Sequence, residues 1–247
     1  MRIIQISDLH VAREGLPTHG VDSRGNFLRV LDRLAGLAWD LLLVTGDLCF
    51  PDGEAGLYVW IRERLDALGR PYAVLAGNHD DPRAMAAVFG PERLAGGPGA
   101  FPFSTSLAGF PVIFVDSHAD RVEPAELERL GAALSGRPHP AGSPGLVFMH
   151  HPPLAMGCRF MDENYPLLNA AETAEALRGA AGTTLVFCGH CHAEAAAFER
   201  GLGVYSAPAT SFGIATDPPE LEVEAAAIGW RWIELAGGGL RTGVRYA

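Results

Sequence analysis

Short hydrophobic runs recur along the chain and alternate with longer stretches in which the apolar residues have helical spacing. The runs predict strands at Arg2–Ile6, Leu41–Thr45, Tyr72–Ala76, Pro111–Val115, Gly145–Met149 and Thr184–Cys188. The stretches between them predict helices at Asn26–Ala38, Glu54–Leu68, Pro82–Phe89, Pro124–Leu134 and Ala171–Ala180. Strands that alternate with helices in this way are typical of βαβ units, so the pattern predicts the α/β class.

The pattern changes in the last quarter of the chain, where shorter strands are predicted at Glu194–Arg200, Gly203–Ser206 and Trp230–Leu235. No linker or internal repeat divides the sequence, and we therefore expect a single domain over residues 1–247. The segment Pro152–Pro166 follows a pair of histidines. We expect it to be a surface loop or, in the sharper interpretation, a lid that faces a substrate.

Composition and charge limit the classes of function. Of the 247 residues, 48% are hydrophobic and 19% are charged, which is enough apolar material to fill a globular core. No apolar run approaches the roughly 20 residues that cross a bilayer, and polar residues directly after the first strand leave no room for a signal peptide. We therefore expect a cytoplasmic protein without membrane contact. The net charge of −10 argues against a long nucleic acid as partner, because Lys and Arg provide most of the affinity for its backbone.

The four cysteines do not change this picture. Cys188 and Cys191 have the Cys-x-x-Cys spacing of some zinc and redox sites. A structural zinc site of this type needs a second pair of ligands at matched spacing, which the sequence lacks. We expect free thiols.

Five polar clusters follow predicted strands, each at the point where a strand ends. They are Asp8-Leu9-His10, Gly46-Asp47, Gly77-Asn78-His79-Asp80, His150-His151-Pro152-Pro153 and Gly189-His190-Cys191-His192. In open α/β sheets, ligands bind at this carboxyl edge. On an extended backbone, residues i and i+2 point the same way, so Asp8 with His10, and His190 with His192, are each expected to aim at one place.

The donor atoms of these clusters are carboxylate, amide and imidazole groups, which suit zinc, manganese or iron. Seven of the side chains are candidate ligands: Asp8, His10, Asp47, Asn78, His150, His190 and His192. Seven donors exceed the needs of one catalytic zinc but fit two ions roughly 3.5–4 Å apart. With two carboxylates and a bridging hydroxide, two divalent ions leave a positive site that attracts phosphate and provides the nucleophile.

The order of these motifs resembles the calcineurin-like metallophosphoesterase superfamily, and within it the bacterial class III cyclic nucleotide phosphodiesterase and glycerophosphodiesterase branch. The resemblance implies a four-layer α/β/β/α sandwich with a dinuclear metal site at the C-terminal ends of the strands. It implies that Asp8, His10 and His192 hold the first metal and that Asp47 bridges both. Asn78, His150 and His190 would complete the second metal, while His79 would face the leaving-group oxygen.

The sequence thus predicts an enzyme that hydrolyses small phosphodiesters, namely cyclic nucleotides or glycerophosphodiesters, with two transition-metal ions drawn from manganese, iron, zinc and cobalt. A phosphomonoesterase with the same site and a non-catalytic scaffold of the same fold remain as alternatives, and a homo-oligomer is left open. Several neighbouring polar residues receive lesser roles. We expect His151, Asp80 and Asp81 to support ligands or cap helices, His118 to be an ordinary loop residue, and His19 and His139 to be solvent-exposed.

Overall fold

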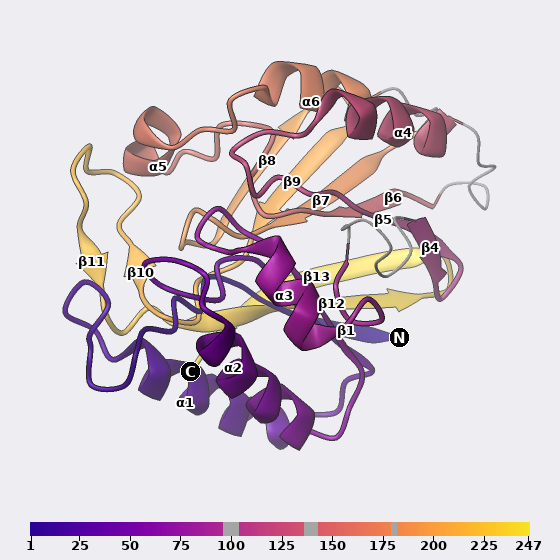
Figure 1. Cartoon of the computed structure of the whole chain (residues 1–247). Helices are drawn as coiled ribbons and strands as arrows, with labels where there is room; N and C mark the ends of the chain where they lie inside the picture. Colours follow the sequence, from indigo (N-terminus) through magenta and orange to yellow (C-terminus); the bar gives the residue numbers. More distant parts are fainter. Residues whose placement is uncertain (96–103, 136–142, 179–181) are drawn as a thin grey trace.

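The computed structural model describes residues 1–95, 104–135, 143–178 and 182–247, and His139 lies outside these ranges. Two β-sheets form the centre of the molecule (Figure 1). The first sheet has the strand order β13-β12-β1-β2-β3. Its strands are β1 (Arg2–Ile6), β2 (Leu41–Thr45), β3 (Tyr72–Leu75), β12 (Gly229–Ala236) and β13 (Gly239–Tyr246). The strands β1, β2 and β3 are parallel, whereas β12 and β13 are antiparallel additions at one side.

The second sheet has the order β4-β5-β6-β7-β9-β8. Its strands are β4 (Ser104–Leu107), β5 (Phe110–Phe114), β6 (Gly145–Phe148), β7 (Thr184–Cys188), β8 (Ala195–Glu199) and β9 (Leu202–Ser206). The four inner strands are parallel, and the two edge strands are antiparallel to their neighbours. A short hairpin of β10 (Gly213–Ile214) and β11 (Val223–Glu224) lies outside both sheets.

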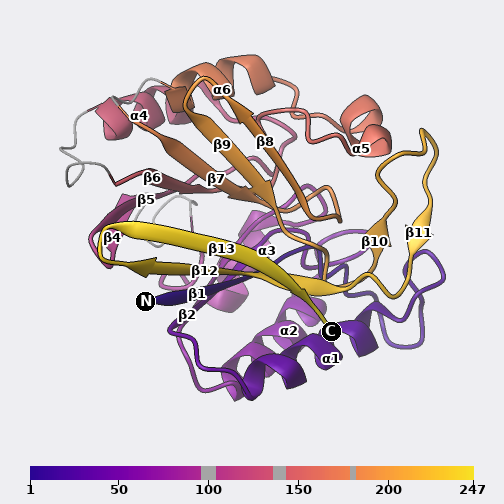
Figure 2. The same cartoon turned by 180° about the vertical axis from the view of Figure 1, so that it is seen from behind.

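Helices cover the outer face of each sheet, and the two views agree on this arrangement (Figures 1 and 2). The helices are α1 (Ser23–Ala35), α2 (Ala55–Ala67), α3 (Pro82–Phe89), α4 (Pro124–Ser135), α5 (Arg159–Asn164) and α6 (Ala170–Arg178). The first three pack on the first sheet and the last three on the second. Between the sheets lies a third apolar layer that contains Leu43, Phe114 and Phe148. The predicted α/β/β/α sandwich is confirmed.

Most predicted elements are present with boundaries that shift by a few residues. The helix α1 begins three residues before its predicted start, because the carboxylate of Asp22 caps it by accepting from the N–H of Gly25 at 2.9 Å. Asp81 likewise caps α3, with Pro82 at its first position. No helix in the described ranges is both long and apolar enough to cross a membrane.

Four strands were not predicted, namely β4, β10, β11 and β13. The strand β13 is an edge strand with mixed polar and apolar side chains, so it lacks a continuous hydrophobic run. The sequence feature that indicates β13 is the Gly-Gly pair of the turn before it. Gly237 and Gly238 have φ angles of 56° and 76° and join β12 to β13 as a two-residue hairpin.

The carboxyl ends of the parallel strands of both sheets meet at one side of the sandwich. Gln5 at the end of β1 is fully buried there, and its amide donates to the hydroxyl of Thr45 in the same sheet and to the carbonyl of Cys188 in the other. The Nδ1 atom of His150 similarly donates to the carbonyl of Thr45 at 2.8 Å. These contacts join the two sheets where the five polar clusters begin.

Candidate metal centre

The turns after the strands hold their residues in an unusual backbone conformation. Nine non-glycine residues of the described chain have positive φ, and five of them are predicted ligands: Asp8, His10, Asp47, His190 and His192. The left-handed region is unfavourable for such residues, and this kind of strain concentrates at functional sites. The expectation of an extended backbone at these positions is therefore wrong. Asp8 and His10 still converge, but His190 and His192 face different groups of side chains.

The glycines of these turns permit close approach between segments. A Cβ atom at Gly46 would collide with the imidazole of His150, and one at Gly189 would collide with the side chain of Ser7. Only glycine therefore lets the turn after β2 and the turn after β7 lie against side chains from other strands.

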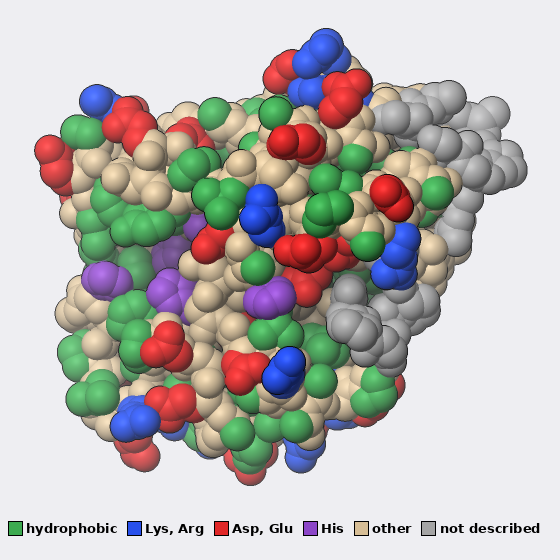
Figure 3. Space-filling view, turned by 45° about the horizontal axis from the view of Figure 1, so that its top comes forward, with side chains coloured by type: hydrophobic (Ala, Val, Ile, Leu, Met, Phe, Trp, Pro, Cys, Tyr) green, Lys and Arg blue, Asp and Glu red, His purple; other side chains and the backbone are tan. Residues whose placement is uncertain are grey.

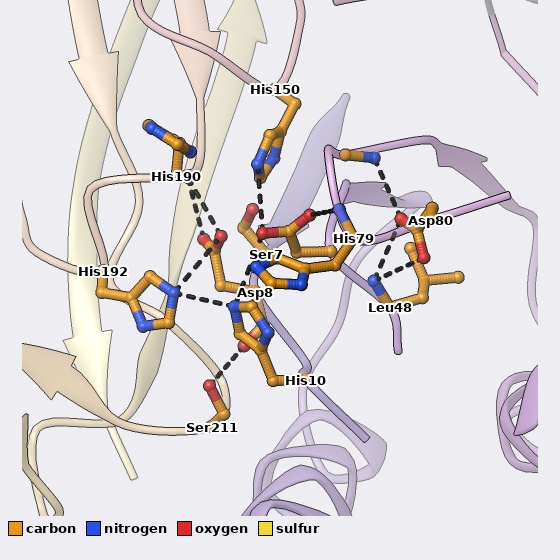
Figure 4. A network of polar contacts seen from close by, with 12 residues as sticks. Ser7, Asp8, His10, Leu48, His79, Asp80, His150, His190, His192 and Ser211 are labelled. Carbon is orange, nitrogen blue, oxygen red and sulfur yellow. Dashed lines mark hydrogen bonds and ion pairs between the residues drawn. The ribbon is translucent and has the colours of Figure 1, made fainter. Parts of the chain in front are cut away.

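The first group consists of Asp8, His10 and His192, and all three side chains are buried (Figure 4). The Nε2 atoms of His10 and His192 are 2.9 Å apart, and the Nε2 atom of His192 is 3.7 Å from Oδ1 of Asp8. The Nδ1 atom of His192 donates to the carbonyl of Phe212 at 2.8 Å, so its Nε2 atom presents a lone pair to the group. The side chains predicted for the first metal thus come together.

Asp47 lies between the two groups. Its Oδ2 atom is 3.5 Å from Nε2 of His10 and 3.3 Å from Nε2 of His150. Burial would raise the pKa of this carboxyl, but the attraction of His150, His10 and His79 holds it well below its usual value. Asp47 is therefore an anion that faces histidines of both groups, the position that a bridging ligand requires.

The second group contains His150 and His190 together with His151, and Asn78, the third residue predicted for the second metal, lines the cavity with His190. The hydrogen bond from Nδ1 of His150 to Thr45 leaves Nε2 free, and that atom is buried without a hydrogen-bond partner. In His190, Nε2 donates to the carbonyl of Tyr165 at 2.8 Å, which leaves Nδ1 free. Burial lowers the pKa of His190 well below its usual value, and the neighbouring His151 and His150 add to this effect. Its neutral imidazole is the form that binds metal.

The donor atoms of these groups suit metal ions. The buried oxygen Oδ1 of Asn78 has no hydrogen-bond partner, and the buried nitrogen Nε2 of His150 has none either but faces Oδ2 of Asp47 at 3.3 Å. A buried polar atom without a partner costs about 1–3 kcal/mol, so such atoms need an explanation. Carboxylate oxygens, an amide oxygen and fixed imidazole tautomers around them make a donor set for two transition ions.

His79 takes a place distinct from its neighbour Asn78. Its backbone N–H donates to Oδ1 of Asp47 at 3.0 Å, and its Nδ1 atom donates to the carbonyl of Pro51 at 2.7 Å. Its ring packs edge-on against that of His10, with 5.1 Å between centroids. Both rings line a cavity over the site, which is described below. His79 thus orients the candidate bridging carboxylate through its backbone and leaves its Nε2 atom for another role.

Asp80 and His151 make buried contacts beside the candidate ligands. The carboxylate of Asp80 accepts from the N–H groups of Leu48 and Gly77 and from the hydroxyl of Tyr58, which ties the turn after β2 to the turn after β3. Burial, followed by the charge of Asp47, raises the pKa of Asp80 to about 6. The ring of His151 is held by Ser117, whose hydroxyl is 3.0 Å from Nδ1.

His151 also packs against His190, with 4.3 Å between ring centroids, and its Nε2 atom is 3.3 Å from Oδ1 of Asp120. It belongs to a group with His150 and His190 whose geometry would suit a metal, so the fold places it closer to the site than sequence alternation indicates. His118 instead hydrogen-bonds Asp116 at 2.9 Å.

The cysteines form no disulfide in the described structure, and all four are buried. The Sγ atom of Cys188 donates to the carbonyl of Tyr205 at 3.4 Å, whereas Cys191 lies beside Cys158. The two residues of the Cys-x-x-Cys spacing therefore have separate partners, which agrees with free thiols.

A cavity of about 310 Å³ opens over the two groups. Figure 3 shows histidine side chains at the surface bordered by hydrophobic ones. The segment Pro152–Pro166 is not a plain loop, because it contains α5 and supplies Phe160, Met161 and Tyr165 to the cavity wall. Its helix escaped prediction because it is short and because Asp162, inside the helix, caps the preceding N–H groups of Met156, Gly157 and Cys158.

His19 was expected to be solvent-exposed, and it is, yet it also lines this cavity. Its ring packs between Phe50 and Phe212, with centroid distances of 5.3 and 5.5 Å. Nothing in the residues around His19 reveals this place, because Phe212 comes from the far end of the chain.

The chain resembles several known proteins. The family model for calcineurin-like phosphoesterases matches residues 1–194. A protein of Synechococcus sp. named as a probable cyclic nucleotide phosphodiesterase is 31% identical over 95% of this chain and 88% of its own length. The glycerophosphodiester phosphodiesterase GpdQ of Enterobacter lignolyticus is 30% identical over 85% of this chain and 77% of its own. A crystal structure of a dimetal phosphatase from Danio rerio, 13% identical, superposes with a TM-score of 0.72 over 100% of this chain and 96% of that one.

Proposed function

This chain belongs to the calcineurin-like phosphoesterase family, and we propose that it hydrolyses small phosphodiesters at a site for two metal ions. The relatives named as cyclic nucleotide and glycerophosphodiester phosphodiesterases suggest these two substrate classes. The acidic chain, with a net charge of −10, disfavours long nucleic acids.

One observation carries this proposal. Donor atoms from the turns after β1, β2, β6 and β7 converge around Asp47, and the turn after β3 adds Oδ1 of Asn78, which is buried without a hydrogen-bond partner. We assign Asp8, His10 and His192 to one ion, Asn78, His150 and His190 to the other, and Asp47 to both. When bound, two such ions supply a hydroxide nucleophile at neutral pH and positive charge against the phosphate.

One side chain of the protein, His79, is placed to act on the leaving group. His79 lines the cavity beside His10, and Pro51 holds the proton of its Nδ1 atom. Its Nε2 atom therefore carries a proton only when the ring is an imidazolium. In that form His79 donates the proton to the departing alkoxide oxygen, which is the usual contribution of a positioned general acid.

The activity test compares bis(p-nitrophenyl) phosphate with p-nitrophenyl phosphate on one metal-analysed preparation. We expect a higher kcat/KM for the diester, loss of activity on chelation, and recovery with manganese, iron, zinc or cobalt. Long double-stranded DNA should be a poor substrate. A higher kcat/KM for the monoester would assign the site to a phosphomonoesterase, and metal binding without hydrolysis of either ester would indicate a scaffold.

A further inference from the structure

The cavity over the candidate metal centre has a floor and a wall of different chemistry. The floor consists of the polar side chains already described. On one side the wall is aromatic and is formed by Phe50, His19 and Phe212, with Phe160 and Tyr165 on the α5 segment that also lines the cavity. No Lys or Arg is among the described residues that line it, and its one carboxylate, Asp47, belongs to the floor.

His19 is the polar member of this wall. Its two ring contacts hold it between Phe50 and Phe212, and neither of its nitrogens makes a hydrogen bond or ion pair in the described structure. Burial lowers the pKa of His19, and His192 and His79 lower it further, so the ring is neutral at neutral pH. A neutral imidazole offers one donor and one acceptor at the mouth of the cavity.

The three aromatic rings beside the candidate metal centre, with the His19 ring inclined by 58° to Phe50 and by 66° to Phe212, suit one kind of substituent. A planar aromatic ring stacks on such faces, and His19 can hydrogen-bond its polar edge. A quaternary ammonium group also binds aromatic rings, but it would lie close to two metal ions without a wall carboxylate to balance its charge. A glycerol unit would leave the aromatic faces unused and would find few polar partners there.

We propose that the wall of Phe50, His19 and Phe212 binds the planar base of a nucleotide substrate, with His19 as the residue that determines specificity for it. This inference rests on the proposed diesterase function and makes it narrower, because it favours cyclic nucleotides over glycerophosphodiesters. With about 310 Å³, the cavity is at the small end of the usual range for ligand pockets, which suits a mononucleotide.

The test uses two variants and two diesters. Phe50→Leu keeps an apolar side chain but removes the ring, and His19→Asn removes the imidazole with a residue that tolerates the φ of 47° at this position. The kcat/KM for 3′,5′-cyclic AMP relative to glycerophosphoethanolamine should fall at least about fivefold in each variant, mainly through KM. Phe198→Leu, which changes an exposed ring on β8, is the matched control and should leave the ratio as in the wild type.

Binding of 5′-AMP to the metal-loaded protein, measured by calorimetry, provides a readout that does not need turnover. We expect both variants to raise its Kd at least about fivefold, while metal content and Tm stay at the wild-type values. Equal losses on both diesters, or a Kd that neither variant changes, would overturn the inference while leaving the diesterase proposal intact. A loss confined to glycerophosphoethanolamine, whose ammonium group is a cation, would assign the wall to a cation instead.

If the wild-type protein hydrolyses neither diester, the proposed function fails and the 5′-AMP measurement alone decides this inference. Weaker binding in both variants would still support a base-binding wall. Equal binding by the wild type and both variants would contradict it.

Discussion

The Nε2 atoms of His10 and His192 lie 2.9 Å apart, although the two residues are separated by 182 positions in the sequence. Two imidazole lone pairs at this distance repel unless a proton or a cation lies between them. Burial holds the pKa of His10 well below its usual value, so the proton is that of a neutral ring, whose Nε2–H tautomer donates to Nε2 of His192. With Oδ1 of Asp8 3.7 Å from His192 and Oδ2 of Asp47 3.5 Å from His10, the same nitrogens also suit a cation in place of that proton.

The first prediction concerns the metal content. We expect close to two transition ions per chain, and Asp47→Ala should lose metal and more activity than any other single substitution, because its carboxylate faces both groups. Loss of an outer-shell partner of a metal commonly costs about 10–100-fold, so loss of this ligand should cost more. Metal analysis and diester hydrolysis measure both effects, with Asp52→Ala, an exposed carboxylate, as the control. Unchanged metal content in Asp47→Ala would contradict the assignment.

The second prediction separates His79 from the ligands. His79→Ala keeps the backbone N–H that donates to Asp47, so both ions should stay bound. The rate on 3′,5′-cyclic AMP should fall about 10²–10⁴-fold, because its alkoxide leaving group needs a proton. The rate on bis(p-nitrophenyl) phosphate should fall far less, since nitrophenolate leaves without one. Loss of an ion would make His79 a ligand or its support, and equal losses on both substrates would exclude proton donation.

The third prediction compares two neighbouring carboxylates. The partners of the Asp80 carboxylate are all hydrogen-bond donors. In Asp80→Asn, the amide NH₂ would therefore face a donor, and at least one buried group would be left without a partner. This should cost about 1–3 kcal/mol, or roughly 2–12 °C in Tm for a chain of this size, and should weaken metal binding. Asp81→Asn is the matched control, because asparagine caps helices about as well as aspartate. Equal Tm values for the two variants would contradict the role given to Asp80.

The fourth prediction concerns pH and stability. Burial raises the pKa of Glu126 from 4.5 to about 7, although the N–H of Asp116 donates to its carboxylate. Because the folded-state pKa lies above the unfolded one, this group destabilises the fold as the pH rises from about 4.5 through 7. After allowance for partial exposure, the penalty above pH 7 is about 1–2 kcal/mol.

Glu126→Gln should therefore raise the Tm by about 2–8 °C at pH 8 and by much less at pH 5. Glu128→Gln changes an exposed residue of the same helix and serves as the control. Thermal unfolding of the three proteins at both pH values measures the effect. A gain that is equal at pH 5 and pH 8 would show that the ionisation of Glu126 is not its source.

The sequence was sufficient for the parts of the molecule that local patterns specify. The inner strands such as β2 and β7 are buried on both faces, so each appears as a continuous hydrophobic run. The candidate ligands follow such strands directly, and the topology brings strand ends to one edge, so motif order was enough to predict that these polar clusters lie together. The edge strand β13 and the short helix α5 were missed because their stability comes from a hairpin turn and a back-reaching carboxylate.

Tertiary structure alone decided which side chains surround these ligands. The place of His19 depends on Phe50 and on Phe212, almost 200 residues away, and no local periodicity records that contact. No local periodicity records the packing of His151 against His190 either. His190 and His192 face different groups because their backbone is left-handed and not extended. The sequence by itself determined the strands and the donor groups, because hydrophobic runs and motif order are local. The two packed sheets decided how those donors face one another and what lines the cavity above them, because such contacts join segments that only the fold brings together.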